Sequence, residues 1–382
     1  MEEESLPEKR GRRGLTVSDL HLFSDYTKAN ELLPLLDAAI EREGEKPADM
    51  VVLNGDIFDF EFPGNISFED ELEKLGFDLE EEKDKQTLEK LGVLRHVQYD
   101  LGSYKPIKDV DAVLNLAVAW LWKFCESHPQ TQVHYIIGNH DGVYCPDGLE
   151  NKKSRDFPSR LKKLKKVLKE EAGADNFHVH GETFSPAMNV MFTHGDLPMR
   201  KQNIHSRPYI PIDEVKSPDS GDEERKFHHA VEQWIYSNPT LLSLAHQYAG
   251  YHNRPQHIDP CVIRAQRKIK KGRHDLFHIF MGHTHVPRTN DKVEQPITDP
   301  QTGEKYLQRF HIHNTGSAVS RKEFNMLEFD LEETTQKREG KKDKVTTLLT
   351  EVRRAPELGE QRMGWVDKMK ARAAPYVGAL QC

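Results

Sequence analysis

Cysteine is scarce in this sequence, and the cysteines that occur are scattered. The 382 residues include four, Cys125, Cys145, Cys261 and Cys382, with no Cys-x-x-Cys pair among them. This spacing argues against a disulfide framework and against a site built on paired thiolates. It fits a reducing compartment, so we expect the protein to be cytoplasmic.

Long apolar runs and a positive net charge are also missing. No stretch approaches the roughly 20 apolar residues of a membrane-spanning helix, so we expect no transmembrane segment. The opening residues, MEEESLPEKRGRRG, are charged and contain no apolar segment, so we expect no signal peptide. The formal net charge is -8, which argues against a wholly basic nucleic-acid-binding protein but leaves room for a local basic patch.

Histidine, by contrast, is abundant, and several of the 20 histidines directly follow short apolar runs that predict strands. The predicted strands are residues 14–17, 50–53, 133–137, 177–180, 189–192, 276–281 and 310–313, with two closing strands at 326–331 and 346–352. Residues 29–43 have the apolar spacing of a helix and lie between the first two strands. The order strand, helix, strand suggests a right-handed crossover in an α/β layer.

Two stretches interrupt this α/β pattern, and we interpret both as helical insertions. Residues 67–123 contain an acidic stretch and then helical patterns at about 88–97 and 110–124. Residues 200–273 contain a polar break followed by further helical spacing. Both stretches have the period of helices rather than of strands.

The domain organisation follows from these interruptions. We predict a core over residues 15–320 that contains both insertions, followed by closing strands and a C-terminal tail over residues 321–382. The charged residues 332–344, between the two closing strands, predict a hairpin loop or a disordered segment.

Five strand ends carry side chains of the kinds that bind metal ions. In chain order they are Asp19 with His21, Asp56, Asn139 with His140, His194, and His283 with His285. Because strand ends in an α/β sheet meet at one edge, we expect these side chains to lie close together. Carboxylate oxygen combined with imidazole nitrogen suits divalent ions such as Mn²⁺, Fe²⁺, Zn²⁺ or Co²⁺. A central carboxylate can bridge two such ions, the arrangement used for phosphoryl chemistry.

The motifs DLH, GDIFD, GNHD, HGD and GHTH occur in this order between Asp19 and His285. The ordered set resembles the calcineurin-like metallophosphoesterase superfamily over residues 15–317, apart from the insertions. The resemblance implies an α/β sandwich of two mixed β-sheets flanked by helices. It also implies that the protein is a hydrolase, which cleaves a phosphate ester by attack of a metal-bridging hydroxide.

The resemblance further implies a role for each motif residue, with two divalent ions as cofactors. The first ion would be held by Asp19, His21, the bridging Asp56 and His285. The second would be held by Asp56, Asn139, His194 and His283. His140 would face the substrate and assist the leaving oxygen, and Asp59 would pair with His140.

Other residues leave the subfamily open. Phe60 and Asp141 stand where protein Ser/Thr phosphatases carry Arg and Glu, and Asp59 stands where purple acid phosphatases place a tyrosine ligand. SDLHL, GDIFD and HGD resemble bacterial UDP-diacylglucosamine hydrolases, although those enzymes typically have Arg in place of His140. SDLHL and GNHD also resemble the repair nucleases of the superfamily. We expect Asp141 to orient its own loop.

Three functions therefore compete: a phosphoesterase, a nuclease of the same superfamily, and an inactive interaction protein on the same fold. We favour a small or medium phosphate ester as substrate over duplex nucleic acid, because the chain is acidic and lacks interleaved aromatic and basic residues. Arg200, Lys201, His205 and Arg207 follow His194 and are candidates for contact with a substrate phosphate. Monoester, diester, nucleotide sugar and phosphoprotein all remain open, as does the oligomeric state.

Overall fold

A computed structural model describes the protein over the parts of the chain that carry its layers. These parts are residues 8–60 without 25–26, 28 and 43, residues 67–94, 110–141 without 139, 153–195 without 182, 276–298 without 284–286, 303–316 without 304, 326–336 and 344–355. The predicted insertion at 200–273 lies outside them, and the division into core, insertions and tail stays a prediction.

The described residues form ten strands and five helices. The strands are β1 (Glu8–Val17), β2 (Met50–Asn54), β3 (Gln132–Ile136), β4 (Phe177–His180), β5 (Val190–Phe192), β6 (Leu276–Met281), β7 (Arg288–Thr298), β8 (Lys305–Asn314), β9 (Leu327–Gln336) and β10 (Lys344–Arg354). The helices are α1 (Ala29–Ile40), α2 (Phe68–Lys74), α3 (Glu82–Leu91), α4 (Val110–Ser127) and α5 (Lys153–Glu171).

The strands make two mixed sheets, as the family resemblance implies. The larger has six strands in the order β10-β9-β1-β2-β3-β4, and the smaller has four in the order β5-β6-β8-β7. Strands β1 to β4 are parallel, and β5, β6 and β8 are parallel in the second sheet. Antiparallel strands β9, β10 and β7 complete the sheets. The parallel strands of each sheet therefore all end at the same edge of that sheet.

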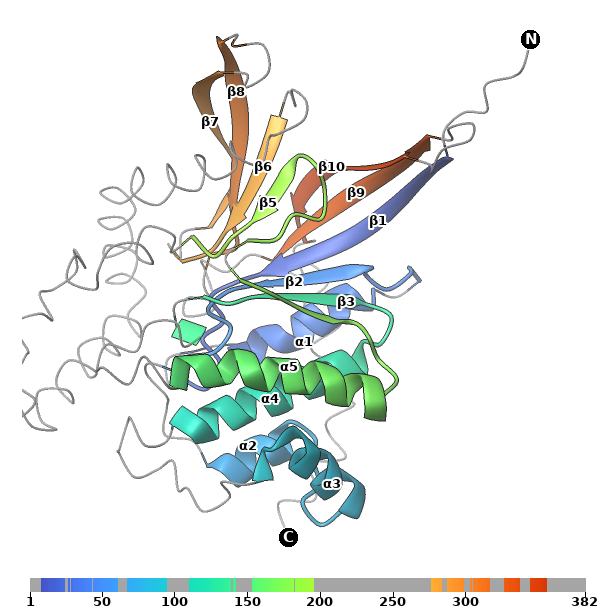
Figure 1. Ribbon diagram of the computed structural model, residues 1–382, viewed down its shortest axis with the longest axis vertical. Coiled ribbons are helices and arrows are strands. Elements are labelled where there is room, and N and C mark those ends of the chain that lie inside the picture. The colour runs from blue at the N-terminus through green and yellow to red at the C-terminus, as the bar shows by residue number, and fades with distance from the viewer. Residues whose placement is uncertain are drawn as a thin grey trace, which may run out of the picture.

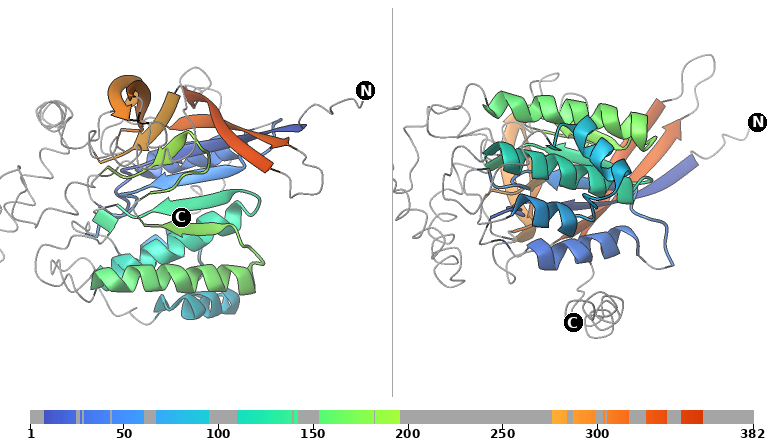
Figure 2. Two further views of the ribbon diagram at one scale, coloured as in Figure 1. Left: turned by 45° about the horizontal axis from the view of Figure 1, so that its top comes forward. Right: turned by 90° about the horizontal axis from the view of Figure 1, so that it is seen from below.

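Three layers result (Figure 1). Helices α1, α4 and α5 cover one face of the six-stranded sheet, and α2 and α3 pack on the outer side of α4 and α5. The four-stranded sheet packs against the other face. The right view of Figure 2 shows α5, α4 and α1 from below, side by side across the sheet. Among the described residues, no helix combines the length and apolar character needed to cross a membrane.

Alternation along the buried strands builds the two cores of the sandwich. On β2, Val51 and Leu53 belong to the cluster under the helices, whereas Val52 belongs to the cluster between the sheets. This strand is buried on both faces, which explains its continuous apolar run. Between the sheets, Phe192 and Phe280 stack at 4.4 Å between ring centroids. Each fully buried side chain of this size contributes about 1.5–3 kcal/mol relative to an exposed one.

The structure corrects the predicted helix at 88–97. Helix α3 begins earlier, at Glu82, with Glu82 and Asp84 in its first turn, and it ends at Leu91. Gly92 then takes a left-handed conformation with φ of 83°, and its N–H bonds the carbonyl of Glu89. Glycine adopts this conformation without a steric penalty, so it terminates the helix before the apolar spacing ends.

Several strands also differ from the sequence prediction. Strands β1 and β8 begin earlier than predicted, at Glu8 and Lys305. Strand β9 continues to Gln336, so the first five residues of the predicted loop at 332–344 are paired with β10. Strand β7 was not predicted at all. It is an edge strand with Pro296 inside it, and its side chains are mostly polar. Such a strand lacks the apolar run that marks a buried one.

Candidate metal centre

The predicted ligands gather where the parallel strands of the two sheets end. Asp19 follows β1, Asp56 follows β2, His194 follows β5 and His283 follows β6. Two clusters form there, each with its ligand atoms within 4.8 Å of one another. The first contains Asp19, His21 and Asp56, and the second contains Asp56, His194 and His283. Asn139 and His285 lie outside the described residues.

Asp56 belongs to both clusters, which is what a carboxylate shared by two ions requires. Its side chain is 1 % exposed, and its Oδ1 accepts a hydrogen bond of 2.8 Å from the backbone N–H of His140. Burial by itself raises the pKa of Asp56, but attraction to His194, His140 and His21 outweighs burial and holds the pKa well below its ordinary value. The carboxyl group is therefore ionised and ready to bind cations.

The backbone at the ligands is strained. Asp19, His21, Asp56 and His283 all have positive φ, at 52°, 49°, 49° and 64°. Non-glycine residues in this region cost roughly 1–2 kcal/mol each. Hydrogen bonds between the two loops hold them in place: Asp19 N–H donates to Gly55 O at 3.0 Å, and His21 N–H donates to Asp56 O at 3.1 Å. Strain of this kind gathers at functional sites.

Two glycines permit the close approach of these loops. A Cβ on Gly138 would lie 2.2 Å from Oδ1 of Asp56, and a Cβ on Gly282 would lie 2.4 Å from Oδ2 of Asp19. Both distances are far inside van der Waals contact. Any side chain at either position would push a ligand carboxylate out of its cluster.

The two hydrogen-bond partners of His194 require a positive charge, either on the ring itself or on an ion beside it. Its Nδ1 lies 3.1 Å from the carbonyl oxygen of Asn54, and its Nε2 lies 2.9 Å from Oδ2 of Asp56. Both neighbours are acceptors, but a neutral imidazole carries only one N–H. With Nδ1–H bound to Asn54, Nε2 needs either a second proton or a metal ion to meet the carboxylate. The carbonyl partner fixes the ring in the way that outer-shell partners fix metal-binding histidines.

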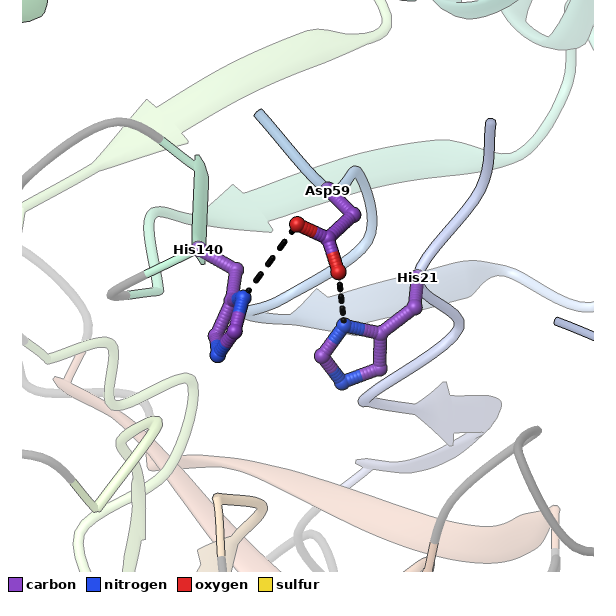
Figure 3. Close-up of side chains that lie close together, drawn as sticks. All are labelled: His21, Asp59 and His140. Atoms are coloured by element: carbon purple, nitrogen blue, oxygen red, sulfur yellow. Dashed lines mark hydrogen bonds and ion pairs between the residues drawn. The ribbon is translucent and has the colours of Figure 1, made fainter. Parts of the chain in front are cut away.

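Asp59 joins the first cluster, through His21, to His140 (Figure 3). Its Oδ2 lies 3.1 Å from Nδ1 of His21, and its Oδ1 lies 3.3 Å from Nδ1 of His140. An ionised carboxylate only accepts, so both Nδ1 atoms donate and both Nε2 atoms are left for other partners. Burial raises the pKa of Asp59, but His140 and His21 outweigh it and lower the pKa far below the ordinary value. Asp59 is therefore ionised, and it fixes both rings.

Asp141 does hold its loop, as we expected. Its Oδ1 accepts from Phe58 N–H and its Oδ2 accepts from Gly138 N–H, both at 2.9 Å. It thereby ties the loop after β3 to the loop after β2, which carries Asp56. Burial, followed by the nearby Asp56 carboxylate, raises the pKa of Asp141 to about 7, against the effect of these two hydrogen bonds.

The structure thus brings together seven of the nine residues predicted for the site. They are Asp19, His21, Asp56, Asp59, His140, His194 and His283. Sequence reasoning missed the contact of Asp59 with His21 and the carbonyl partner of His194. It also missed Ser18, which donates to Oδ2 of Asp19. Arg200, Lys201, His205 and Arg207 lie outside the described residues.

The comparison with protein families agrees with this geometry. The model of the calcineurin-like phosphoesterase family matches residues 15–287, well over half of the chain. The chain belongs to the calcineurin-like phosphoesterase family. No curated protein matched it closely enough to serve as a relative. As in other calcineurin-like phosphoesterases, the buried His and Asp clusters are of the kind that forms a dinuclear metal site.

Proposed function

We propose that this chain is a metal-dependent phosphoesterase that hydrolyses a phosphate ester with two divalent ions in the candidate metal centre. One observation carries the proposal: two buried ligand clusters share a single carboxylate, Asp56. Two ions held in this way would act as Lewis acids on the phosphate oxygens and would activate water for attack on phosphorus.

The donor set fits two such ions. Asp19, His21 and Asp56 would hold the first ion together with His285, and Asp56, His194 and His283 would hold the second together with Asn139. Oxygen and nitrogen donors without thiolate suit Mn²⁺, Fe²⁺ or Zn²⁺. An ionised Asp56 between the two ions would lower the repulsion between them.

His140 would supply the proton that the leaving oxygen needs. Its Nδ1–H is held by Asp59 at 3.3 Å, so a proton on Nε2 can pass to another acceptor. An alkoxide leaves poorly, and protonation by a positioned side chain contributes about 10²–10⁴-fold to such reactions. Asp59 favours the charged imidazole because its own carboxylate is ionised.

For the substrate, we propose a small or medium phosphate ester rather than duplex nucleic acid. The net charge of -8 supports this choice, because binding to a duplex relies on basic side chains at its phosphates. A nuclease of the same superfamily and an inactive interaction protein are the alternatives. The cytoplasm stays the proposed location, on the scattered cysteines alone.

A substrate panel tests the proposal. Purified protein with added Mn²⁺ would be assayed on phosphomonoesters, cyclic nucleotides, simple diesters, nucleotide sugars, a phosphopeptide and plasmid DNA. We expect hydrolysis of one class of small ester and no cleavage of the plasmid. Plasmid cleavage with an affinity that falls steeply with salt would favour the nuclease. Absence of hydrolysis across the panel by protein that carries both ions would favour the inactive scaffold.

A further inference from the structure

We propose that Ser18 and Thr315 are positioning residues that hold Asp19 in the metal centre through a chain of hydrogen bonds between the two sheets. The inference rests on the proposed function, because it assigns Asp19 to the first ion. Neither residue belongs to the predicted ligand set, and neither side chain is exposed by more than 2 %.

The chain of hydrogen bonds crosses the sandwich. Ser18 follows β1 of the six-stranded sheet, and Thr315 follows β8 of the four-stranded sheet. Their hydroxyl oxygens lie 2.5 Å apart. Ser18 Oγ also contacts Oδ2 of Asp19. The two hydroxyls therefore form a continuous path from the end of one sheet to a ligand carboxylate carried by the other.

The direction of these hydrogen bonds follows from the number of protons that the two hydroxyls can donate. An ionised Asp19 can only accept, so the single proton of Ser18 goes to Asp19. Ser18 then has no proton left for Thr315, and Thr315 must donate to Ser18. Hydrogen bonds in such a series polarise one another, so loss of Thr315 weakens the bond from Ser18 to Asp19.

The same carboxylate also accepts hydrogen bonds from a backbone N–H of the second ligand cluster. The backbone N–H of His283 lies 2.9 Å from Oδ1 and 3.1 Å from Oδ2 of Asp19. The end of β8 supports the segment before His283, because the side chain of Asn314 donates to Gly282 O at 2.9 Å. Asn314 and Thr315 therefore fix Asp19 of the first cluster and the segment that carries His283 of the second.

This arrangement predicts an effect on metal binding rather than on packing alone. Removal of a residue that hydrogen-bonds a metal ligand typically lowers metal affinity or activity 10–100-fold. Thr16 offers a matched control on the same strand. Its hydroxyl is buried and donates to Val52 O at 3.0 Å, but it contacts no ligand.

The test compares four variants, each stripped with chelator and titrated with Mn²⁺ by calorimetry. Ser18→Ala and Thr315→Val remove the two hydroxyls, Thr315→Ser keeps its hydroxyl, and Thr16→Val is the control. We expect Ser18→Ala and Thr315→Val to lower the affinity for one of the two ions about 10–100-fold. Thr315→Ser should bind like the wild type. Thr16→Val should bind Mn²⁺ normally, whatever its loss in thermal stability.

Kinetics on an ester identified by the substrate panel give a second readout. Ser18→Ala and Thr315→Val should lower kcat at limiting Mn²⁺, with KM little changed and the rate recovered at high Mn²⁺. Unchanged Mn²⁺ affinity in both variants, or an equal loss in Thr16→Val, would overturn the inference. Because affinity is measured without substrate, a wild type that binds two ions but hydrolyses nothing would overturn only the proposed function. A wild type that binds no Mn²⁺ would overturn both.

Discussion

The Oδ1 atom of Asp59 lies 3.3 Å from the Nδ1 atom of His140, and the second oxygen of the carboxylate contacts another histidine. That second oxygen lies 3.1 Å from Nδ1 of His21, a predicted ligand of the first ion. One buried carboxylate therefore orients both a metal ligand and the proposed general acid (Figure 3). The rings of His21 and His140 are 4.8 Å apart and nearly perpendicular. A substitution of Asp59 should therefore affect both His21 and His140.

Asp59→Asn should consequently weaken metal binding as well as catalysis. An amide has one acceptor oxygen where the carboxylate has two, so one of the two rings loses its partner or changes its tautomer. We expect roughly 10–100-fold loss in metal affinity or rate, the usual effect of an outer-shell partner. Metal analysis alongside the rate at saturating Mn²⁺ separates the two effects. Wild-type metal affinity together with a wild-type rate would show that Asp59 orients neither ring.

His140→Ala should retain both ions while losing about 10²–10⁴-fold in rate, the usual contribution of general acid catalysis. The backbone N–H that donates to Asp56 survives this substitution, so the bridging carboxylate stays in place. The loss should be much smaller for nitrophenyl esters, because an acidic leaving group needs little protonation. The measurement compares the rates at which the variant and the wild type hydrolyse alkyl and nitrophenyl esters. An equal loss for both esters, or a loss of metal, would contradict the role assigned to His140.

Gly138→Ala should damage the metal centre although it replaces no predicted ligand. The added methyl would lie 2.2 Å from Oδ1 of Asp56 and 2.3 Å from its backbone nitrogen, so the loop carrying Asp56 must shift. We expect metal affinity to fall by roughly 10–100-fold.

Gly181→Ala is the matched control for this substitution. A Cβ there meets nothing within 4 Å, and the residue is outside the left-handed region. It should leave metal binding unchanged and alter stability by less than about 1 kcal/mol. Metal content by elemental analysis and thermal unfolding decide the comparison. Normal metal binding in Gly138→Ala would mean that the loop tolerates the shift.

The pair His278 and His313 should make the metal-free fold sensitive to acid. The N–H of Asn290 lies 3.3 Å from Nδ1 of His313, so Nε2 of His313 carries the proton and donates to Nδ1 of His278 at 3.0 Å. Burial, followed by the nearby His311, lowers the pKa of His278 from 6.5 to about 4. In the unfolded chain His278 takes up a proton near pH 6.5, whereas in the folded protein it does so only near pH 4. The stability contributed by the neutral form is thus present above pH 6.5 and is lost as the pH falls toward 4.

At about 1.4 kcal/mol per pKa unit, this loss is on the order of 3 kcal/mol. His278→Asn keeps an acceptor for His313 but does not titrate, so it should flatten the pH dependence. Denaturant unfolding of chelator-treated protein between pH 8 and pH 4 measures the difference. Parallel curves for the variant and the wild type would show that His278 does not carry the effect.

Much of the fold was predictable because buried strands have a recognisable apolar pattern in the sequence. Strands β2, β3, β5 and β6 are short apolar runs, and each ends in a polar loop, so both the strand and its functional end were visible. Strand β7 has no such apolar pattern, since an edge strand with polar side chains is specified by its partner β8 rather than by its own pattern. The end of α3 at Gly92 was missed for a related reason, because one left-handed residue outweighed the apolar spacing beyond it.

The side chains that gather at the site were predictable by residue type and position, but the residues that support them were not. Asp19, Asp56, His194 and His283 stand at strand ends, and the ordered set of motifs that contains them indicates metal binding. Ser18 and Thr315 are ordinary hydroxyl residues 297 positions apart, and only the packing of the two sheets brings them together. Asp59 was predicted for His140 through family resemblance, whereas its bond to His21 depends on the strained loop after β1.

The most direct test of the dinuclear centre is a metal titration of chelator-stripped protein, with bound metal and ester hydrolysis measured on the same samples. The shared carboxylate of Asp56 predicts that activity returns only as binding approaches two ions per chain, and that Asp56→Asn neither binds both ions nor recovers activity. Full hydrolysis by protein that contains no metal, or saturation of activity with a single ion, would contradict the account.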